Sequence, residues 1–382
     1  MDFDLPEDIR LLKETVRRFV DRELIPIELD CMDGPDLKPD VRAHLEGKAR
    51  EVGLWLLDVP EEYGGLGLNY LAMSAIWEEI ARTVALPPRG PMIFGPDPKP
   101  IMYELNDAQK QKYLLPMLRG ELKAAFAQTE PDAGADPGSM RTTAVRQGGH
   151  YIVNGTKRFI SHAGDADFIQ LVVATDRTKG SRGGLSTLLV DMNTPGVSVT
   201  RRSIKMMGDA TYELSFQDAR VAAENLIGNE GDGMKLGQKY ITYGRLYQAC
   251  RGLGVAQRCI ELSSRYAKQR VTFGAPLADR QSIQFMIADM FIEHSIGQTN
   301  VYQTAWKADN NKLARHESYV TKTFCTELGF RAADRCMQIH GGMGLTQETP
   351  IYKMWKDSRS FMITEGAVEV MRMVLAREVL RM

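Results

Sequence analysis

The sequence lacks three features that would set it apart from ordinary globular proteins: paired cysteines, an excess of one charge and a long apolar run. Its five cysteines are odd in number and form no CxxC pair, which argues against a disulfide or zinc framework. The net charge of −1 gives no reason to expect nucleic acid or anionic lipid as a partner. No apolar run approaches the roughly 20 residues of a membrane span, and the acidic N-terminus has no signal-peptide core. We therefore expect a cytoplasmic protein.

Several familiar motifs are also missing. The six histidines show no HExxH spacing, so we predict no metal site. The glycine clusters at 64–69, 252–257 and 341–346 lack the strand–turn–helix context of a dinucleotide fingerprint, and GNEGDGMKL lacks the Gly-Lys-Ser/Thr of a P-loop. We interpret them as loops or helix breaks. No GxSxG elbow is present, although spacing alone leaves a Ser/His/Asp site open.

The hydrophobic pattern predicts a multidomain α+β protein in which helical regions precede and follow a β region. We place the N-terminal helical domain at 1–120, the middle β domain at 121–230 and a C-terminal four-helix bundle at 231–382. Amphipathic stretches support the first domain. They are expected at 5–20, 71–83 and 107–120. Six prolines and two glycines in residues 86–100 indicate a loop or a broken helix.

The middle domain consists of short β-branched runs, each bounded by Gly, Asp or Pro, with no long helix between them. This pattern predicts an antiparallel barrel or sandwich. In HYIVNGTKRFI, the pair Asn154-Gly155 predicts a hairpin turn between two strands. The last domain carries long helices with short connections, which predict an antiparallel bundle. These helices are expected around 233–268, 281–308, 316–340 and 365–380.

Three segments carry groups that suit a bound cofactor or a reaction, and each also has an ordinary structural reading. The segment 126–136 can present N–H and hydroxyl groups to a heteroaromatic ring, or it is a surface turn. Arg270 is well shaped for a pyrophosphate, but an arginine near a helix C-terminus is routine. Glu365 follows the apolar residues Phe361, Met362 and Ile363. A carboxylate there is unfavourable unless it is paired or functional, and the alternative is an acid at a helix N-terminus.

Taken together, these segments resemble the acyl-CoA dehydrogenase family over the whole chain. The motifs QTEPDAGAD, YAKQRVTFG, QIHGGMGLTQETPI and TEGAVEVMRMVLAR occur in family order and spacing, and VPEEYGGLG and NGTKRFIS add to the match. The resemblance implies a helical domain, a β domain and a four-helix bundle. It also implies FAD held between the β domain and the bundle, with a neighbouring subunit completing the site. A homotetramer, or at least a dimer, is therefore expected.

The resemblance also implies which residues meet the cofactor and the substrate. The residues expected beside the flavin ring are Phe126, Gln128, Thr129, Phe159 and Ser161. The residues expected at the pyrophosphate and adenosine half are Arg270, Phe273 and Gln281, with Gln338, Gly341 and Gly342 from the adjacent subunit. Ala367 and Glu369 complete the cofactor set. The residues expected to contact the acyl-CoA are Ala135, Thr242, Tyr243, Arg245, Gly366 and Arg89.

In this resemblance Glu365 falls on the family's catalytic base. The α-hydrogen of a thioester is weakly acidic, so its removal needs a carboxylate in a dry site, which Phe361, Met362 and Ile363 are expected to supply. The base's N–H and a flavin ribityl hydroxyl would hold the thioester carbonyl. Hydride would pass from the β-carbon to flavin N5, giving a trans-2-enoyl-CoA. The family's other position for the base reads Gly244-Arg245 here and carries no carboxylate.

Departures from the family pattern concern the substrate. Ala135 replaces a serine and Ala367 a threonine. Arg89 in the proline-rich segment and Arg251 favour a branched, cyclic or carboxylated acyl group, although Arg89 also fits a solvated loop arginine. The leading interpretation is a dehydrogenase that passes electrons to an electron-transferring flavoprotein. The alternatives are an acyl-CoA oxidase, an enoyl-CoA reductase or a non-catalytic acyl-CoA-binding homologue.

Overall fold

The computed structural model describes residues 4–34, 36–86, 93–312 and 315–381. The chain forms two compact units. The helical unit comprises Met1–Phe94 and Thr242–Met382, and the β unit comprises Gly95–Ile241. The described part of the chain contains no helix that is both long and apolar enough to cross a membrane.

The first part of the helical unit is built around one buried helix, α3 (Tyr70–Ile80). Its residues from Leu71 to Ile80 are all buried, and the Asn69 side chain caps it by accepting from the N–H of Ala72. The other elements here are α1 (Glu7–Phe19), η1 (Val20–Leu24), η2 (Ile25–Ile27), β1 (Met32–Asp33), β2 (Asp36–Leu37), α2 (Pro39–Glu51) and η3 (Glu61–Tyr63). The helices expected at 5–20 and 71–83 are confirmed, whereas α2 was not foreseen.

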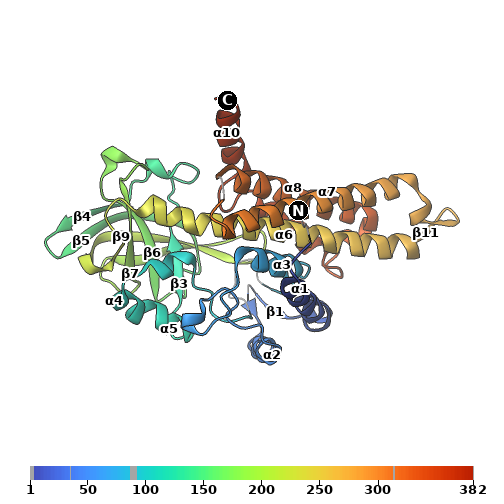
Figure 1. Cartoon of the computed structure of the whole chain (residues 1–382), viewed down its shortest axis with the longest axis horizontal. Helices are drawn as coiled ribbons and strands as arrows, with labels where there is room; N and C mark the ends of the chain where they lie inside the picture. The colour runs from blue at the N-terminus through green and yellow to red at the C-terminus, as the bar shows by residue number, and fades with distance from the viewer. Residues whose placement is uncertain (1–3, 35, 87–92, 313–314, 382) are drawn as a thin grey trace. The chain divides into compact units, whose positions relative to one another are not determined.

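The second part of the helical unit holds three long helices and two short ones (Figure 1). They are α6 (Gly233–Gln269), which begins in the β unit, α7 (Gln281–Asp309), α8 (Arg315–His340), α9 (Ile351–Phe361) and α10 (Val368–Val379), with β11 (Val271–Thr272), β12 (Ala275–Pro276), η9 (Leu277–Asp279) and η10 (Gly341–Leu345) between them. The first three expected helices are confirmed. The fourth begins later than expected, at Val368, and α9 precedes it.

The glycine cluster at 252–257 lies inside α6, so its interpretation as a loop was wrong. A Cβ on Gly252 would lie 2.0 Å from the carbonyl oxygen of Cys325, and one on Gly254 would lie 2.3 Å from that of Glu78. Glycine is therefore needed here for close approach of α6 to the backbones of α8 and α3. The other two clusters do lie outside α-helices, in the loop before α3 and in η10.

The β unit contains one eight-stranded sheet, in which β10, β7, β6, β4, β5, β9 and β8 follow one another and β3 pairs with β6 (Figure 1). The strands are β3 (Ala124–Ala127), β4 (Thr143–Gln147), β5 (His150–Ser161), β6 (Phe168–Ala174), β7 (Leu185–Asp191), β8 (Val197–Ile204), β9 (Ala210–Ala222) and β10 (Leu226–Ile227). The short helices are η4 (Pro100–Glu104), α4 (Asp107–Gln109), η5 (Lys110–Leu114), α5 (Leu115–Leu118), η6 (Pro137–Ser139), η7 (Arg177–Lys179) and η8 (Ala223–Asn225).

Two features of the sheet differ from expectation. First, β3 and β4 run parallel to β6, so the sheet is mixed rather than purely antiparallel. Every residue of β6 is buried, as fits a central strand covered on both faces. Second, Asn154-Gly155 is not a hairpin turn but lies inside β5, where a Cβ on Gly155 would lie 2.5 Å from Thr142 Oγ1. The turn before β5 is instead Gly148-Gly149, which joins β4 to β5.

Candidate active site

Glu365 lies in the turn between α9 and α10, in a backbone conformation that its side chain disfavours. Its φ is +56°, and Gly366 follows with a φ of +94°. The left-handed region costs a residue with a Cβ about 1 kcal/mol or more. Such a conformation persists only where surrounding contacts enforce it, so this turn is a candidate functional element.

The Glu365 side chain packs against bare backbone of α6. A Cβ added to Gly244 would lie 2.8 Å from Glu365 Cδ and 2.9 Å from Oε2. The absence of a side chain at Gly244 is therefore what makes room for the carboxylate. A side chain at position 244 would occupy the space that the Glu365 carboxylate fills. The two positions therefore cannot both carry a carboxylate.

The surroundings of Glu365 are partly apolar and partly cationic. Phe361 and Met371 are buried, but Ile363 is 60% exposed and does not shield the site as expected. Arg245 is buried, and its guanidinium lies 4.5 Å from the centre of the Tyr319 ring. A Cβ on Gly366 would lie 3.8 Å from Arg245 Nη2, so this arginine borders the turn.

Lys322 on α8 lies beneath the same turn and was missed by sequence reasoning. Its side chain is fully buried, and Nζ donates to the carbonyl oxygens of Gly366 at 2.7 Å and Met362 at 3.2 Å. Burial lowers the pKa of Lys322 to about 7, opposed by Glu365 and reinforced by Arg245. The available signal was its spacing, because Lys322 lies three residues from both Tyr319 and Cys325 on the buried face of α8.

The expected substrate residues near position 244 have separate partners. The Tyr243 hydroxyl donates to Asp58 Oδ2 at 2.7 Å, and its ring packs edge-on against Trp77 with centroids 4.9 Å apart. Thr242 is half-buried. The Arg251 guanidinium lies 4.1 Å from the centre of the Phe361 ring, just before the Glu365 turn. Arg89 lies outside the described residues.

In the β unit, a buried ion pair ties the loop after β3 to β5. Lys157 Nζ donates to Glu130 Oε1 at 2.8 Å and to the carbonyl oxygen of Gln128 at 2.9 Å. Burial lowers the pKa of Lys157 to about 8, with Glu130 opposing. Burial by itself would raise the pKa of Glu130, but the Lys157 charge outweighs it and that pKa is lowered. The Arg158 N–H donates to the Thr129 carbonyl at 2.8 Å, so Gln128 and Thr129 lie beside β5.

The end of β5 presents an aromatic ring and a hydroxyl. A register shift between Lys157 and Ile160 coincides with a φ of +60° at Phe159, whose ring is more than half exposed. Ser161 Oγ is buried and has no hydrogen-bond partner among the described residues. An unsatisfied buried hydroxyl is unfavourable by about 1–3 kcal/mol, so this one is suited to a ligand. Phe126 is half-buried on β3, whereas Ala135 is exposed.

A hollow of about 390 Å³ lies in the helical unit where α6 ends and η10 begins. Its lining residues are Tyr266, Arg270, Leu277, Ile339, His340, Gly341, Gly342 and Met343. The Tyr266 and His340 rings stack with centroids 4.3 Å apart. A Cβ on Gly341 or Gly342 would meet no atom within 4 Å, so the glycine backbone is open to a ligand.

The remaining predicted cofactor residues near this hollow are exposed. Phe273 is 99% exposed with a φ of +48°, and Gln281 and Gln338 are exposed as well. Arg270 and Gly341–Gly342 line one hollow of one chain. Within one chain the two groups therefore lie together, and the contribution of an adjacent subunit to the cofactor site stays a prediction.

Within one chain, the Arg270 hollow lies far from Glu365. Gly244, which contacts Glu365, and Arg270, which follows the end of α6, are separated by 26 residues. At the helical rise this separation is about 39 Å. The Arg270 hollow and the Glu365 turn of a single chain are therefore distinct places. Glu369 and Ala367, in contrast, directly follow the Glu365 turn.

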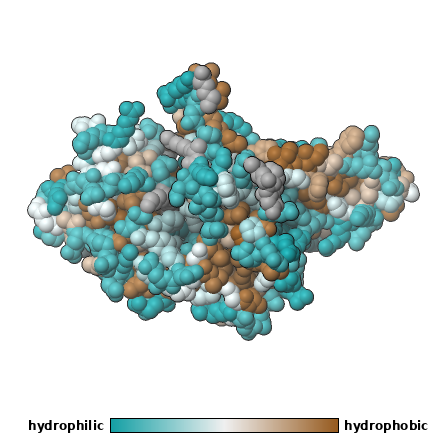
Figure 2. All heavy atoms as spheres, viewed as in Figure 1, coloured by the Kyte–Doolittle hydropathy of each residue, from teal (hydrophilic) through white to brown (hydrophobic). Residues whose placement is uncertain are grey.

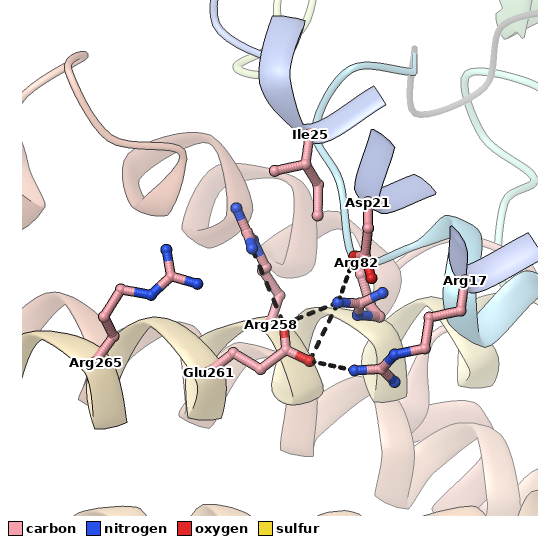
Figure 3. Close-up of a pocket in the computed structure, with 7 residues that line it drawn as sticks. All are labelled: Arg17, Asp21, Ile25, Arg82, Arg258, Glu261 and Arg265. Carbon is pink, nitrogen blue, oxygen red and sulfur yellow. Dashed lines mark hydrogen bonds and ion pairs between the residues drawn. The ribbon is translucent and has the colours of Figure 1, made fainter. Parts of the chain in front are cut away.

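A second hollow, of about 420 Å³, is lined by a network of ion pairs (Figure 3). Arg82 pairs with Asp21 at 2.9 Å and with Glu261 at 3.0 Å, and Arg17 also reaches Glu261 at 3.0 Å. Arg258 lines it too, and lies 14 residues, or about 21 Å, along α6 from Gly244. The network joins α1 and η1 to α6, and it belongs to the structural framework.

Within the described residues, no group of three or more His, Cys, Asp or Glu side chains is arranged to hold a metal ion.

Family models match nearly the whole chain. The N-terminal, middle and C-terminal domain models of acyl-CoA dehydrogenase match residues 6–121, 125–219 and 231–380. The chain belongs to the acyl-CoA dehydrogenase family, whose members are flavin-dependent oxidoreductases acting on acyl-CoA.

Individual relatives support this assignment. The chain is 34% identical to the mitochondrial short-chain specific acyl-CoA dehydrogenase of Mus musculus, covering 99% of this chain and 91% of the relative. It is also 34% identical to subunit CarC of the caffeyl-CoA reductase-Etf complex of Acetobacterium woodii, over 98% and 99%. The solved butyryl-CoA dehydrogenase of Megasphaera elsdenii superposes with a TM-score of 0.84 at 29% identity, with both chains fully covered.

Proposed function

We propose that the chain binds FAD and removes the α- and β-hydrogens of an acyl-CoA thioester to give the trans-2-enoyl-CoA, with Glu365 as the α-proton base. The observation that carries this proposal is the Glu365 carboxylate held against the bare backbone of Gly244 by a left-handed turn. A base must be positioned within hydrogen-bond reach of the proton it takes, and this turn restricts where the carboxylate can point.

The neighbouring residues support proton removal. The buried Phe361 and Met371 limit water around the turn, which strengthens electrostatic interactions there. The Glu365 N–H is proposed to hold the thioester carbonyl and so to stabilise the enolate-like charge that develops when the proton leaves. Arg245, Thr242 and Gly366 are proposed to contact the acyl-CoA.

The residues present fit FAD. The unpartnered Ser161 hydroxyl and the projecting Phe159 ring suit a flavin ring, with Gln128 and Thr129 tied beside them. The exposed Arg270 and the open glycines of the same hollow suit a pyrophosphate, because a guanidinium and backbone N–H groups match its oxygens. Bound FAD supplies the two-electron acceptor for the substrate hydride.

We propose a homotetramer, with a dimer as the smallest complete unit, and the separation of about 39 Å along α6 supports a cofactor site shared between chains. We propose that the Arg270 hollow of one chain completes the cofactor site of another. Exposed apolar residues on one face of α7 are suited to such an assembly, and Figure 2 shows hydrophobic residues gathered where Figure 1 places α7. These residues are Phe285, Ile292 and Ile296. An electron-transferring flavoprotein is the proposed acceptor, as the name of the CarC relative indicates for that protein.

The deciding experiment is anaerobic mixing of the purified yellow protein with a panel of acyl-CoAs while the flavin absorbance is followed. We expect bleaching by at least one saturated acyl-CoA and restoration of colour by an electron-transferring flavoprotein. A colourless protein that binds acyl-CoA would instead indicate a non-catalytic homologue. Rapid peroxide formation in air would indicate an oxidase.

The same panel tests the substrate class. The acyl group is proposed to be carboxylated, branched or cyclic rather than a simple straight chain, and the Arg251 cation beside Phe361, just before the Glu365 turn, supports the carboxylated class. We therefore expect glutaryl- or alicyclic acyl-CoAs to bleach the flavin faster than butyryl- and octanoyl-CoA. A clear preference for the straight chains would reject this substrate class.

A second candidate function is the reverse reaction, reduction of an enoyl-CoA. It is favoured by one observation, the 34% identity to a subunit of a caffeyl-CoA reductase complex. Reoxidation of the dithionite-reduced protein by an enoyl-CoA, with little bleaching of the oxidised protein by the saturated acyl-CoA, would favour reduction.

A further inference from the structure

The Lys322 side chain stabilises the Glu365 turn through two hydrogen bonds. Lys322 Nζ donates to the carbonyl oxygen of Met362, three residues before Glu365, and to that of Gly366, one residue after it. The Val368 N–H donates to the same Met362 carbonyl at 3.0 Å and closes the turn across its base. The two Lys322 bonds thus link the beginning and the end of the segment that carries the base.

This linkage opposes the strain of the turn. Glu365 and Gly366 are consecutive residues with positive φ, and a non-glycine residue in that region needs outside support. The Gly366 carbonyl accepts from Lys322 Nζ in this conformation. A fully buried ammonium is itself unfavourable, so its retention here indicates a role other than packing.

We propose that Lys322 is the positioning residue of the base: by binding the Met362 and Gly366 carbonyls, it maintains the left-handed turn that places the Glu365 carboxylate against Gly244. This inference rests on the proposed function of Glu365. Lys322 touches the backbone of the turn and acts through Glu365, so it takes no part in the proton transfer itself.

The charge of Lys322 adds a second effect. The charged groups that act on its ammonium are Glu365, Arg245, Glu369 and Glu327, on the turn, α6, α10 and α8. With a pKa of about 7, Lys322 loses its charge as the pH rises through neutrality, while a neutral amine still carries N–H donors for both carbonyls. Proton transfer neutralises the Glu365 carboxylate and removes its attraction to the Lys322 cation, an attraction that is absent once Lys322 is neutral. The bleaching rate of the wild type should therefore rise with pH near about 7.

Two variants separate the hydrogen bonds from the charge. Lys322→Met removes both at similar length, and Lys322→Gln keeps amide donors without a titrating charge. Lys353→Met is the matched control, because Lys353 on α9 also donates to a buried backbone carbonyl, that of Val84 at 2.7 Å, outside the Glu365 turn. The readouts are FAD content, acyl-CoA affinity, the single-turnover bleaching rate and its pH profile.

We expect Lys322→Met to keep FAD and acyl-CoA affinity but to bleach about 10- to 100-fold more slowly, as for a misplaced catalytic group. Lys322→Gln should bleach at nearly the rate of the wild type while the rise near pH 7 disappears. Lys353→Met should leave the rate and the profile unchanged. If Lys322→Met keeps the wild-type bleaching rate and pH profile, the inference is overturned. If the methionine variant does not fold, an unchanged pH profile in Lys322→Gln overturns the inference instead. A wild type that no acyl-CoA bleaches refutes the proposed function instead.

Discussion

At the scale of single residues, the candidate site depends on the absence of a side chain at Gly244. Gly244 leaves room for the Glu365 carboxylate, which a Cβ would approach to 2.8 Å. Arg245, next along the chain, is buried beside the turn. A glycine in the middle of a helix is otherwise unfavourable by about 1 kcal/mol relative to alanine. Helix α6 is therefore less stable at Gly244 than it would be with alanine, but the glycine leaves space for the carboxylate.

Gly244→Ala should therefore lower activity without lowering helix propensity. The added methyl would displace the Glu365 carboxylate, so we expect FAD to be retained while flavin bleaching slows by about 100-fold. Stopped-flow bleaching measures this rate. Gly47→Ala in helix α2 is the matched control, because its Cβ would meet no atom within 4 Å. Equal rates in the two alanine variants would show that Gly244 has no role in placing Glu365.

Glu365→Gln tests the base directly. The amide has nearly the shape of the carboxylate but cannot accept the α-proton, so FAD and acyl-CoA should still bind. Bleaching should fall by at least about 100-fold, the usual contribution of a general base. Titration of acyl-CoA affinity alongside the bleaching rate distinguishes lost chemistry from lost binding. Retained bleaching would assign the base to another residue.

Ser161→Ala tests the flavin contact. Removing an unsatisfied buried hydroxyl should leave the stability of the protein without FAD unchanged or slightly higher. If Ser161 binds the cofactor, its loss should weaken FAD affinity about five- to tenfold, the equivalent of one hydrogen bond. Thr187→Val is the control, since Thr187 Oγ1 is also buried in the sheet without a partner among the described residues. Unchanged FAD affinity in Ser161→Ala would remove this residue from the site.

At the scale of elements, buried charge joins the helices. Glu78 on α3 accepts from Lys13 of α1 at 2.8 Å, and from Gln298 and Tyr302 of α7 at 2.6 Å each. His294 of α7 lies 3.3 Å from the same carboxylate. Three helices thus meet around one carboxylate, and a buried pair broken on one side is strongly destabilising.

The pH dependence of stability follows from Glu78. Burial alone would raise its pKa, but His294 and Lys13 outweigh burial and lower the pKa to about 2 from an ordinary 4.5. Because the folded-state pKa is depressed, the contribution is complete above pH 4.5 and is lost as the pH falls from 4.5 toward about 2. The shift corresponds to about 3 kcal/mol.

We therefore expect Glu78→Gln to be less stable than the wild type at neutral pH, and to lose less stability than the wild type between pH 4.5 and 2. Urea unfolding at a series of pH values measures both. Glu7→Gln, which changes an exposed carboxylate, should follow the wild type. Parallel pH curves for the wild type and Glu78→Gln would contradict this account.

At the scale of the whole molecule, the proposed cofactor site would be shared between two chains. The Glu365 turn and the Arg270 hollow are separated by about 39 Å along α6. Phe273 beside the hollow is 99% exposed, which is unusual for a large apolar side chain without a partner surface. Assembly and cofactor binding should therefore be coupled.

Ile292→Asp places a charge on the exposed apolar face of α7. We expect it to dissociate the oligomer and to lose FAD together, because a charge buried in an interface without a partner is unfavourable. Light scattering coupled to gel filtration, with flavin content measured in each peak, gives both quantities. Val145→Asp, at an apolar residue of β4 with similar exposure, is the control. A monomeric wild type with full FAD would refute the coupling.

Several elements were predictable because their signals are local. The 3.6-residue period predicted α6, α7 and α8 to within two residues of their observed ends, and short β-branched runs predicted β6 to β9. Helix α2 was missed because only two of its residues, Leu45 and Ala49, are buried. Its apolar positions are therefore too few to give a recognisable helical pattern in the sequence. The prediction of a hairpin turn at Asn154-Gly155 was wrong because Gly155 allows close packing against Thr142 and does not form a turn.

By itself, the sequence determined the order of helical and β regions, the family and the identity of the candidate base, since these depend on periodicity and on contiguous motifs. Only the tertiary structure decided that Glu365 packs on Gly244, that Lys322 supports the turn, and that Arg270 shares a hollow with Gly341. These contacts join residues 40 to 121 positions apart along the chain. Such proximity arises from the packing of α6, α8 and the turn before α10, which no local pattern encodes.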